Sequence, residues 1–199
     1  MTGCWNDFND AKQNTHLIPK GTLAKVRLTI RPGGFDDPAQ GWTGGYATRG
    51  TTGSVYLSGE FTVLGGPFAR RKIFTLIGLY SPKGPDWANM GRSLIRGMLN
   101  SARGISDKDT SAQAQAARRI SGFADLDGLE FVARIDIGTD TNGEEKNEIR
   151  AAVTPDHKEY AALMGGVPGV AAQPQAQPSQ PSMPQSSKPA AGTRPSWAQ

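Results

Sequence analysis

The stretch VYLSGEFTVLGGPFARRKIFTLIGLY, residues 55–80, decides the fold class of this chain. Apolar and polar residues alternate over residues 55–63, which is the pattern of a strand with one buried face. Residues 73–80 are apolar on both faces, which predicts a central or covered strand. The Gly-Gly-Pro sequence at 65–67 predicts a hairpin between the two strands. The stretch therefore predicts an antiparallel β-structure.

Three further segments have a strand pattern, at residues 24–31, 129–137 and 149–153. Asn-Gly at 142–143 predicts a second hairpin, which joins the last two of these strands. The chain thus contains five predicted strands, three before residue 81 and two after residue 128.

Two helices are predicted between the third and fourth strands. Residues 85–103 place apolar side chains on one arc of a helix, and residues 111–120 form a shorter helix with Thr110 and Gln113 at capping-box spacing. The order β-β-β-α-β-β predicts a mainly β fold, a five-stranded antiparallel barrel like the OB-fold. Other small barrels and sandwiches share this order.

The composition changes after residue 166 and divides the chain into two parts. Residues 1–166 are predicted to form an OB-like nucleic-acid-binding domain, long enough to bury about 70% of its unfolded surface. Residues 167–199 are rich in Pro, Gln, Ser and Ala, which predicts a disordered tail. Trp197 is either an incidental residue of a solubilising tail or the tip that binds a partner protein.

The composition also argues against an enzyme. Cys4 is the only cysteine, which excludes an internal disulfide and a cysteine-based zinc site, and His16 and His157 are the only histidines. The sequence lacks the phosphate-binding glycine motifs and the nucleophile-elbow motif of hydrolases. It predicts no catalytic residue, no metal site and no cofactor, although carboxylates that converge in space are not excluded.

The expected compartment is the cytoplasm. No run of about 18 apolar residues occurs, so the sequence predicts neither a transmembrane helix nor a membrane partner. Residues 1–14 are polar and contain acids, unlike a secretory signal peptide.

The net charge of +4 gives only weak information on partners. Two of the 22 basic residues, Lys188 and Arg194, lie in the tail, whereas all 18 acidic residues precede it. The remaining charge permits a polyanionic partner without requiring one. Local clusters of side chains must therefore identify the function.

Residues 32–53 form the longest predicted loop, with seven Gly together with Trp42, Tyr46 and Arg49. Long structureless loops in a compact domain are usually functional or disordered. Large aromatic side chains on a glycine-rich tether can stack on unpaired bases. The alternative is that Trp42 and Tyr46 fold back and cap the barrel.

Basic and aromatic side chains are interleaved on the predicted sheet as well. This mixture suits a single strand of nucleic acid, because cations contact phosphates while rings stack on bases. A solvated basic face is the alternative, and it is the preferred explanation for Arg92, Arg96 and Arg103 on the helix. The candidate nucleic-acid-binding residues are Lys25, Arg27, Trp42, Tyr46, Arg49, Tyr56, Arg70, Arg71, Lys72 and Phe74.

Three segments carry a family resemblance: LIPKGTLAKVRLTI at 17–30, GEFTVLGGPFARRKIFTLIGL at 59–79, and LDGLEFVARIDI with NGEEKNEIR within 126–150. The cues are the Pro-x-Gly sequence before the first strand, the Phe-x-Val-Leu-x-Gly-Pro turn followed by Arg-Lys, and the late Asn-Glu-Ile strand. In these respects the chain resembles a family of small bacteriophage and prophage proteins from replication or recombination modules, a family described as a domain of unknown function.

The resemblance implies an OB-like fold, single-stranded DNA binding beside phage recombinases, and a bacterial host cytoplasm. We therefore expect a single-stranded DNA-binding protein with little sequence preference and a phage recombinase or replication protein as partner. The alternative is a protein–protein adapter of the same module that does not touch nucleic acid. RNA in place of DNA, and a homo-oligomer, stay open. The tail departs from the acidic tip that such DNA-binding proteins commonly have, because residues 194–199 are RPSWAQ.

Overall fold

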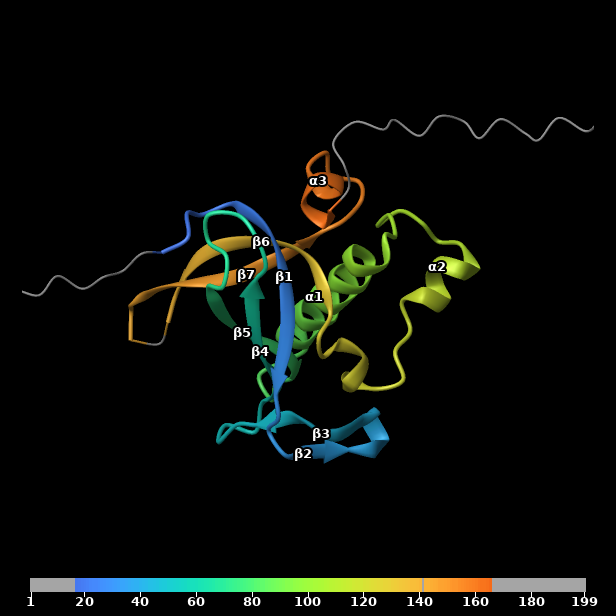
Figure 1. Cartoon of the computed structure of the whole chain (residues 1–199). Helices are drawn as coiled ribbons and strands as arrows, with labels where there is room; N and C mark the ends of the chain where they lie inside the picture. The colour runs from blue at the N-terminus through green and yellow to red at the C-terminus, as the bar shows by residue number, and fades with distance from the viewer. Residues whose placement is uncertain (1–16, 141, 166–199) are drawn as a thin grey trace, which may run out of the picture. The chain divides into compact units, whose positions relative to one another are not determined.

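Seven antiparallel strands form one sheet that curls into a half-barrel in the computed structural model, which describes residues 17–140 and 142–165 (Figure 1). The strands are β1 (Thr22–Arg31), β2 (Phe35–Asp37), β3 (Trp42–Arg49), β4 (Val55–Val63), β5 (Lys72–Tyr80), β6 (Glu130–Thr139) and β7 (Glu145–Val153). The helices in these ranges are α1 (Asp86–Arg103), α2 (Ala112–Ala117) and α3 (Tyr160–Met164), with short 3-10 helices η1 (Pro38–Gln40) and η2 (Phe123–Leu126). The predicted tail at 167–199, with Trp197, lies outside the described residues.

The mainly β prediction is confirmed, but the strand number is wrong. The five predicted strands correspond to β1, β4, β5, β6 and β7, and both predicted hairpins pair as antiparallel strands. The additional strands β2 and β3 form a hairpin inside residues 32–53, where the sequence predicted a structureless loop. The second predicted helix is shorter than expected, and its cap is Ser111, whose side chain accepts the Ala114 N–H at 3.1 Å, rather than Thr110.

The glycines that hid this hairpin from the sequence pattern are required by its geometry. The N–H groups of Gly33 and Gly34 donate to the carbonyl of Gly45 at 3.0 and 2.8 Å. A Cβ atom on Gly33 would lie 1.9 Å from the Thr48 hydroxyl oxygen, so only glycine allows this close approach. Glycine thus replaces the apolar residue that would have revealed the strand alternation.

The strand β1 is the centre of the sheet. Its residues 26–31 pair with β4 and its residues 22–27 pair with β6. The strand β4 also pairs with β5 along most of its length and with β3 at its start, and β7 pairs with β6. This branching bends the sheet around one core, with the β2–β3 hairpin extending from one end (Figure 1).

The helix α1 fills the open side of the half-barrel between β5 and β7 (Figure 1). Within the described ranges these two strands share no backbone ladder, and the Ile149 N–H donates instead to the Thr75 hydroxyl at 2.9 Å. A Cβ atom on Gly91 would lie 1.9 Å from the carbonyl oxygen of Gly78, so α1 approaches β5 as closely as a glycine allows. Among the described residues, no helix is both long and apolar enough to cross a membrane.

The inward faces of the strands carry the core, as the alternation predicted. Val26, Leu28, Phe61 and Phe131 are fully buried, and the two phenylalanine rings meet edge to face at 6.0 Å. The outer face of β5 departs from the prediction of a central or covered strand. Among the described strands, β5 pairs with β4 alone, and the outward apolar side chains Phe74 and Leu76 are exposed rather than covered.

Candidate nucleic-acid interface

The exposed row on β5 consists of Phe74, Leu76 and Tyr80, which are 46, 53 and 49% exposed. Phe74 and Leu76, two residues apart, face outward opposite Glu60 and Ser58 of β4. Tyr80 follows a register shift in this pairing and lies opposite the buried Val55, at the end of the strand. Exposed apolar side chains that gather on one face commonly mark a binding surface. Phe74 is one of the predicted binding residues, and the structure shows Leu76 exposed next to it on this face and Tyr80 exposed at the end of the strand.

The second part of this face is an ion-pair cluster of Arg31, Glu60 and Lys72, here called the Glu60 triad. The Glu60 carboxylate accepts Arg31 at 2.8 Å and Lys72 at 2.6 Å. These hydrogen bonds, from Lys72 and then from Arg31, hold the pKa of Glu60 below its usual value. Glu60 faces Phe74 across the β4–β5 pairing, and the Arg31 guanidinium lies 4.6 Å from the centre of the Phe74 ring. Cations and an exposed ring are therefore held at one place.

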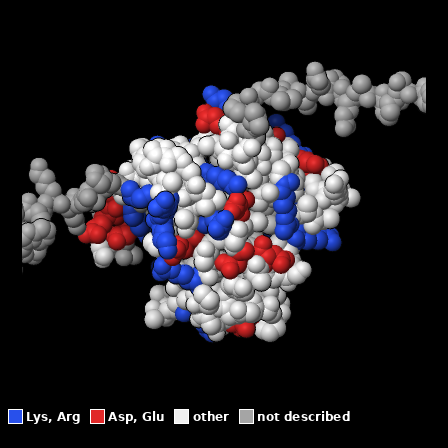
Figure 2. Space-filling view, viewed as in Figure 1, with Lys and Arg blue, Asp and Glu red and all other residues white. Residues whose placement is uncertain are grey.

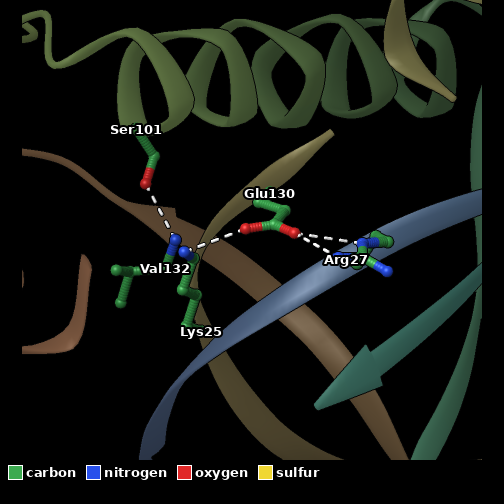
Figure 3. Close-up of polar contacts among 5 residues, drawn as sticks. All are labelled: Lys25, Arg27, Ser101, Glu130 and Val132. Carbon is green, nitrogen blue, oxygen red and sulfur yellow. Dashed lines mark hydrogen bonds and ion pairs between the residues drawn. The ribbon is translucent and has the colours of Figure 1, made fainter. Parts of the chain in front are cut away.

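A similar cluster, the Glu130 triad, lies on β1 and β6 (Figure 3). The Glu130 carboxylate accepts Lys25 at 2.9 Å and Arg27 at 2.5 Å, and these bonds lower the pKa of Glu130, with Lys25 the larger cause. Figure 3 also shows the Val132 N–H, which donates to the Ser101 hydroxyl at 3.0 Å and ties β6 to α1. The predicted residues Lys25 and Arg27 are thus close together, but each is bound to the same acid.

Tyr56 lies on the outer face of β4, opposite Gly78 of β5. Its ring is half-buried and contacts the Trp87 ring at a centroid distance of 6.1 Å and a tilt of 58°. Trp87 in turn covers Gly78, where an added Cβ atom would fall 2.5 Å from the indole. Trp87 was not among the predicted residues, although a tryptophan in the first turn of the predicted helix is a large side chain that needs a packing partner.

Trp42 and Tyr46 are half-buried and pack against the hydrophobic core. The Trp42 ring lies 6.5 Å from the Phe35 ring, and the Arg49 guanidinium lies 5.6 Å from that same ring. Two alternatives were open for Trp42 and Tyr46. The structure favours the one in which they fold back onto the barrel, because both lie on strand β3 and pack against the core. Trp42 remains partly accessible, because it lines a cavity of about 270 Å³ together with Arg49 and Tyr80.

The three basic residues at the β4–β5 turn, Arg70, Arg71 and Lys72, differ in exposure and in their contacts. Arg70 is exposed in the turn with a φ of 68°, and Arg71 is half-buried with its carbonyl accepting the Val63 N–H at 2.9 Å. Lys72 begins β5 and belongs to the Glu60 triad. Of the predicted residues at this turn, Lys72 is thus placed in the triad, and Arg70 is exposed in the turn itself.

The tip of the β6–β7 hairpin carries the opposite charge. Asp140, Glu144, Glu145 and Glu148 lie at or near it, with Lys146 among them. The Asp140 carboxylate accepts the N–H groups of Glu144 and Asn142, which lowers its pKa. The Asp140 carboxylate thus holds the turn of this hairpin together. In Figure 2 basic side chains gather in separate patches over the strands, with acidic side chains among them and at this hairpin.

In residues 17–140 and 142–165, no group of three or more His, Cys, Asp or Glu side chains is arranged to hold a metal ion. No protein-family model matches the chain, and no curated protein matches it. The geometry of the outer sheet face is therefore the basis for a function.

Proposed function

We propose that the chain binds single-stranded DNA, with little sequence preference, on the outer face of β1, β4 and β5. The observation that carries the proposal is the exposed row Phe74, Leu76 and Tyr80 beside the Glu60 triad. Exposed rings offer stacking platforms to unpaired bases of any sequence. The adjacent cations give the phosphates a track alongside.

The connectivity of the strands supports this assignment. If the β2–β3 hairpin is treated as an insertion, the order β1, β4, β5, α1, β6, β7 is that of an OB-like barrel. In OB-folds the second and third strands form the face that binds oligonucleotides, and these correspond to β4 and β5. A role in a phage or prophage replication or recombination module, beside a recombinase, is part of the proposal and rests on the sequence resemblance alone.

The two acids of the face set the expected affinity. Glu60 and Glu130 each bind two cations, so a phosphate competes with a carboxylate for Arg31, Lys72, Lys25 and Arg27. Binding should therefore be moderate in strength and sensitive to salt. The proposal assigns the protein a binding role rather than catalysis.

A protein–protein adapter is the second candidate, and Leu76 is the observation in its favour. Leu76 is the most exposed of the three side chains in the row, and an aliphatic chain has no flat face on which a base can stack. Exposed apolar rows also suit protein partners. The two functions differ in whether nucleic acid binds at all.

A titration of the full chain with labelled oligonucleotides separates these functions. Fluorescence anisotropy with a strand of about 16 nucleotides, the upper end of the OB-fold site size, should show binding at low salt. About three to five phosphate contacts would give a slope near −0.7 per contact in log K against log[salt]. The matching duplex should bind much more weakly, and an RNA strand tests the choice of sugar. Absence of binding at low salt would reject DNA binding and favour the adapter.

A further inference from the structure

A cleft of about 700 Å³ opens between α1, the β2–β3 hairpin and residues 118–123. Its apolar lining includes Trp42, Leu79 and Ile95, and its charged lining is Arg92, Arg96 and Arg118. Among the described residues that line it, none is acidic. The cleft therefore combines an apolar surface with basic side chains alone. On the outer sheet face, by contrast, the basic side chains are paired with the carboxylates of Glu60 and Glu130.

The three arginines differ in how far they are already bound. Arg118 is fixed, because its guanidinium donates to the Asn100 side chain at 2.7 Å and to the carbonyls of Asp109 and Ser106 at 2.7 and 3.0 Å. Arg96 makes one long bond, 3.3 Å, to the Asp107 carbonyl. Arg92 has no hydrogen bond or ion pair with another described residue. Two of the three guanidinium groups are thus available to an anion.

The cleft adjoins the smaller cavity at the end of β5, the strand that carries the exposed row. Gln40, Trp42 and Leu79 line both the cleft and the smaller cavity of about 270 Å³. Tyr80, the last ring of the exposed row, and Arg49 also line the smaller cavity, whose one acidic lining residue among those described is Asp37. A path therefore runs from Tyr80 past the edge of Trp42 to Arg92.

We propose that a single strand of nucleic acid leaves the outer sheet face at Tyr80 and continues into this cleft. A base lies against Trp42, and the phosphates that follow bind Arg92 and Arg96. This inference rests on the proposed function and extends it to a surface outside the strands. The opposite direction is disfavoured, because the acidic β6–β7 tip would repel phosphates. Along this path Trp42 and Arg49 contact the nucleic acid, although the Trp42 ring also packs against the core and the Arg49 guanidinium lies against the Phe35 ring.

Charge reversal at the two available arginines tests the path. The R92E/R96E variant is compared with K20E/R150E, which makes the same change of charge at two exposed residues that line neither cavity. Each protein is titrated with strands of about 4 and about 16 nucleotides, the two ends of the OB-fold site size. Thermal melting of each variant verifies that it is folded.

We expect R92E/R96E to weaken binding of the long strand by about tenfold or more relative to K20E/R150E, because contacts to charged groups are lost. Its salt slope should fall by about 1.4, at about 0.7 for each of two phosphate contacts. Binding of the short strand, which the sheet face alone can hold, should change equally little in both variants. If the double variant does not fold, Arg92→Ala replaces it, since that side chain has no bond to another described residue.

Two results would overturn the path and are distinguishable from one another. If the unmodified protein binds the long strand and R92E/R96E matches K20E/R150E in affinity and salt slope, the path is wrong and the proposed function stands. If the unmodified protein binds neither strand at low salt, the proposed function fails and the path fails with it.

Discussion

The Glu60 triad and the Glu130 triad have the same composition and different surroundings. In each, one carboxylate binds two basic side chains, and in each the pKa of the acid is lowered by those bonds. Beside Glu60 lies the exposed Phe74 ring with Arg31 over its face. Beside Glu130 lie buried residues of β6, where the Val132 N–H is bound to Ser101 of α1.

This difference shows that charge alone does not locate a binding surface on this protein. Each triad carries one excess positive charge, so both attract a polyanion about equally at long range. Stacking acts only at short range and needs an accessible ring. The proposed binding surface is therefore the Glu60 triad with its row on β5, and the Glu130 triad serves as its internal control.

Removal of the exposed rings of β5 should have the largest effect on DNA binding. It would remove the feature that distinguishes the Glu60 triad from the Glu130 triad. The F74A/Y80A variant should lose about 1–3 kcal/mol of DNA-binding free energy for each base that no longer stacks. The salt slope should change little, because no cation is removed. Anisotropy titrations at several salt concentrations measure both quantities.

Leu76→Ala is the matched control for the two rings, since Leu76 lies on the same strand between them and has similar exposure. It removes apolar area and no ring, so DNA binding should weaken far less than in F74A/Y80A. A loss in L76A as large as that in F74A/Y80A would mean that the row acts as an apolar surface. That result would favour the adapter.

The close packing of α1 against β5, the strand that carries the exposed row, should contribute to stability. Gly91→Ala should destabilise the fold by about 1–3 kcal/mol, because the new methyl group would collide with the Gly78 backbone of β5. Gly97→Ala on the same helix meets the Ala152 methyl at 3.3 Å, a tight contact that a small shift relieves, and the higher helix propensity of alanine offsets part of its cost. It should therefore destabilise the fold less than Gly91→Ala. Urea unfolding of both variants measures the difference. Equal stability of the two would show that α1 does not hold β5 as described.

The five strands and the long helix were predictable because their residues repeat with a simple period. In β1, buried Val26 and Leu28 alternate with exposed Arg27 and Thr29, and burial follows the pattern from Ala24 to the end of the strand. In α1, buried Met98 and Leu99 lie on the predicted arc. Local periodicity is sufficient where each element buries one regular face.

The β2–β3 hairpin and the open face of β5 could not be predicted in this way. The hairpin is defined by backbone contacts between Gly33, Gly34 and Gly45, which leave no side-chain period. The apolar residues Phe74 and Leu76 read as covered, because a strand pattern does not reveal which strand pairs on one side only. The cleft arginines Arg92 and Arg96 were assigned to solvent, since only the tertiary fold places Trp42 opposite them.

Neutralising Glu60 or Glu130 compares the two triads directly, with a smaller expected change in DNA affinity. Glu60→Gln should release Arg31 and Lys72 for phosphates beside a stacking ring, so DNA binding tightens and the salt slope steepens by about 0.7 per added contact. Glu130→Gln releases Lys25 and Arg27 where no exposed ring lies in contact, so the gain should be smaller. Titrations of both variants against the unmodified protein measure the two gains. Equal gains would show that charge dominates and that the row contributes little.

The smallest expected effect is the dependence of stability on acid, and it compares the triads without DNA. Because the folded-state pKa of Glu60 and of Glu130 is lowered, each carboxylate stabilises the fold in its charged form. This contribution is complete above the unfolded pKa of a glutamate, about 4.3, and is lost as the pH falls through the folded value. Urea unfolding between about pH 6 and pH 3 should therefore show stability that decreases with acidification. Either Gln variant should flatten that decrease, and E60Q should flatten it more, since the Glu60 side chain is 12% exposed and that of Glu130 is 32% exposed. A larger effect for E130Q would mean that its bonds to β1 stabilise the sheet more than those of the Glu60 triad.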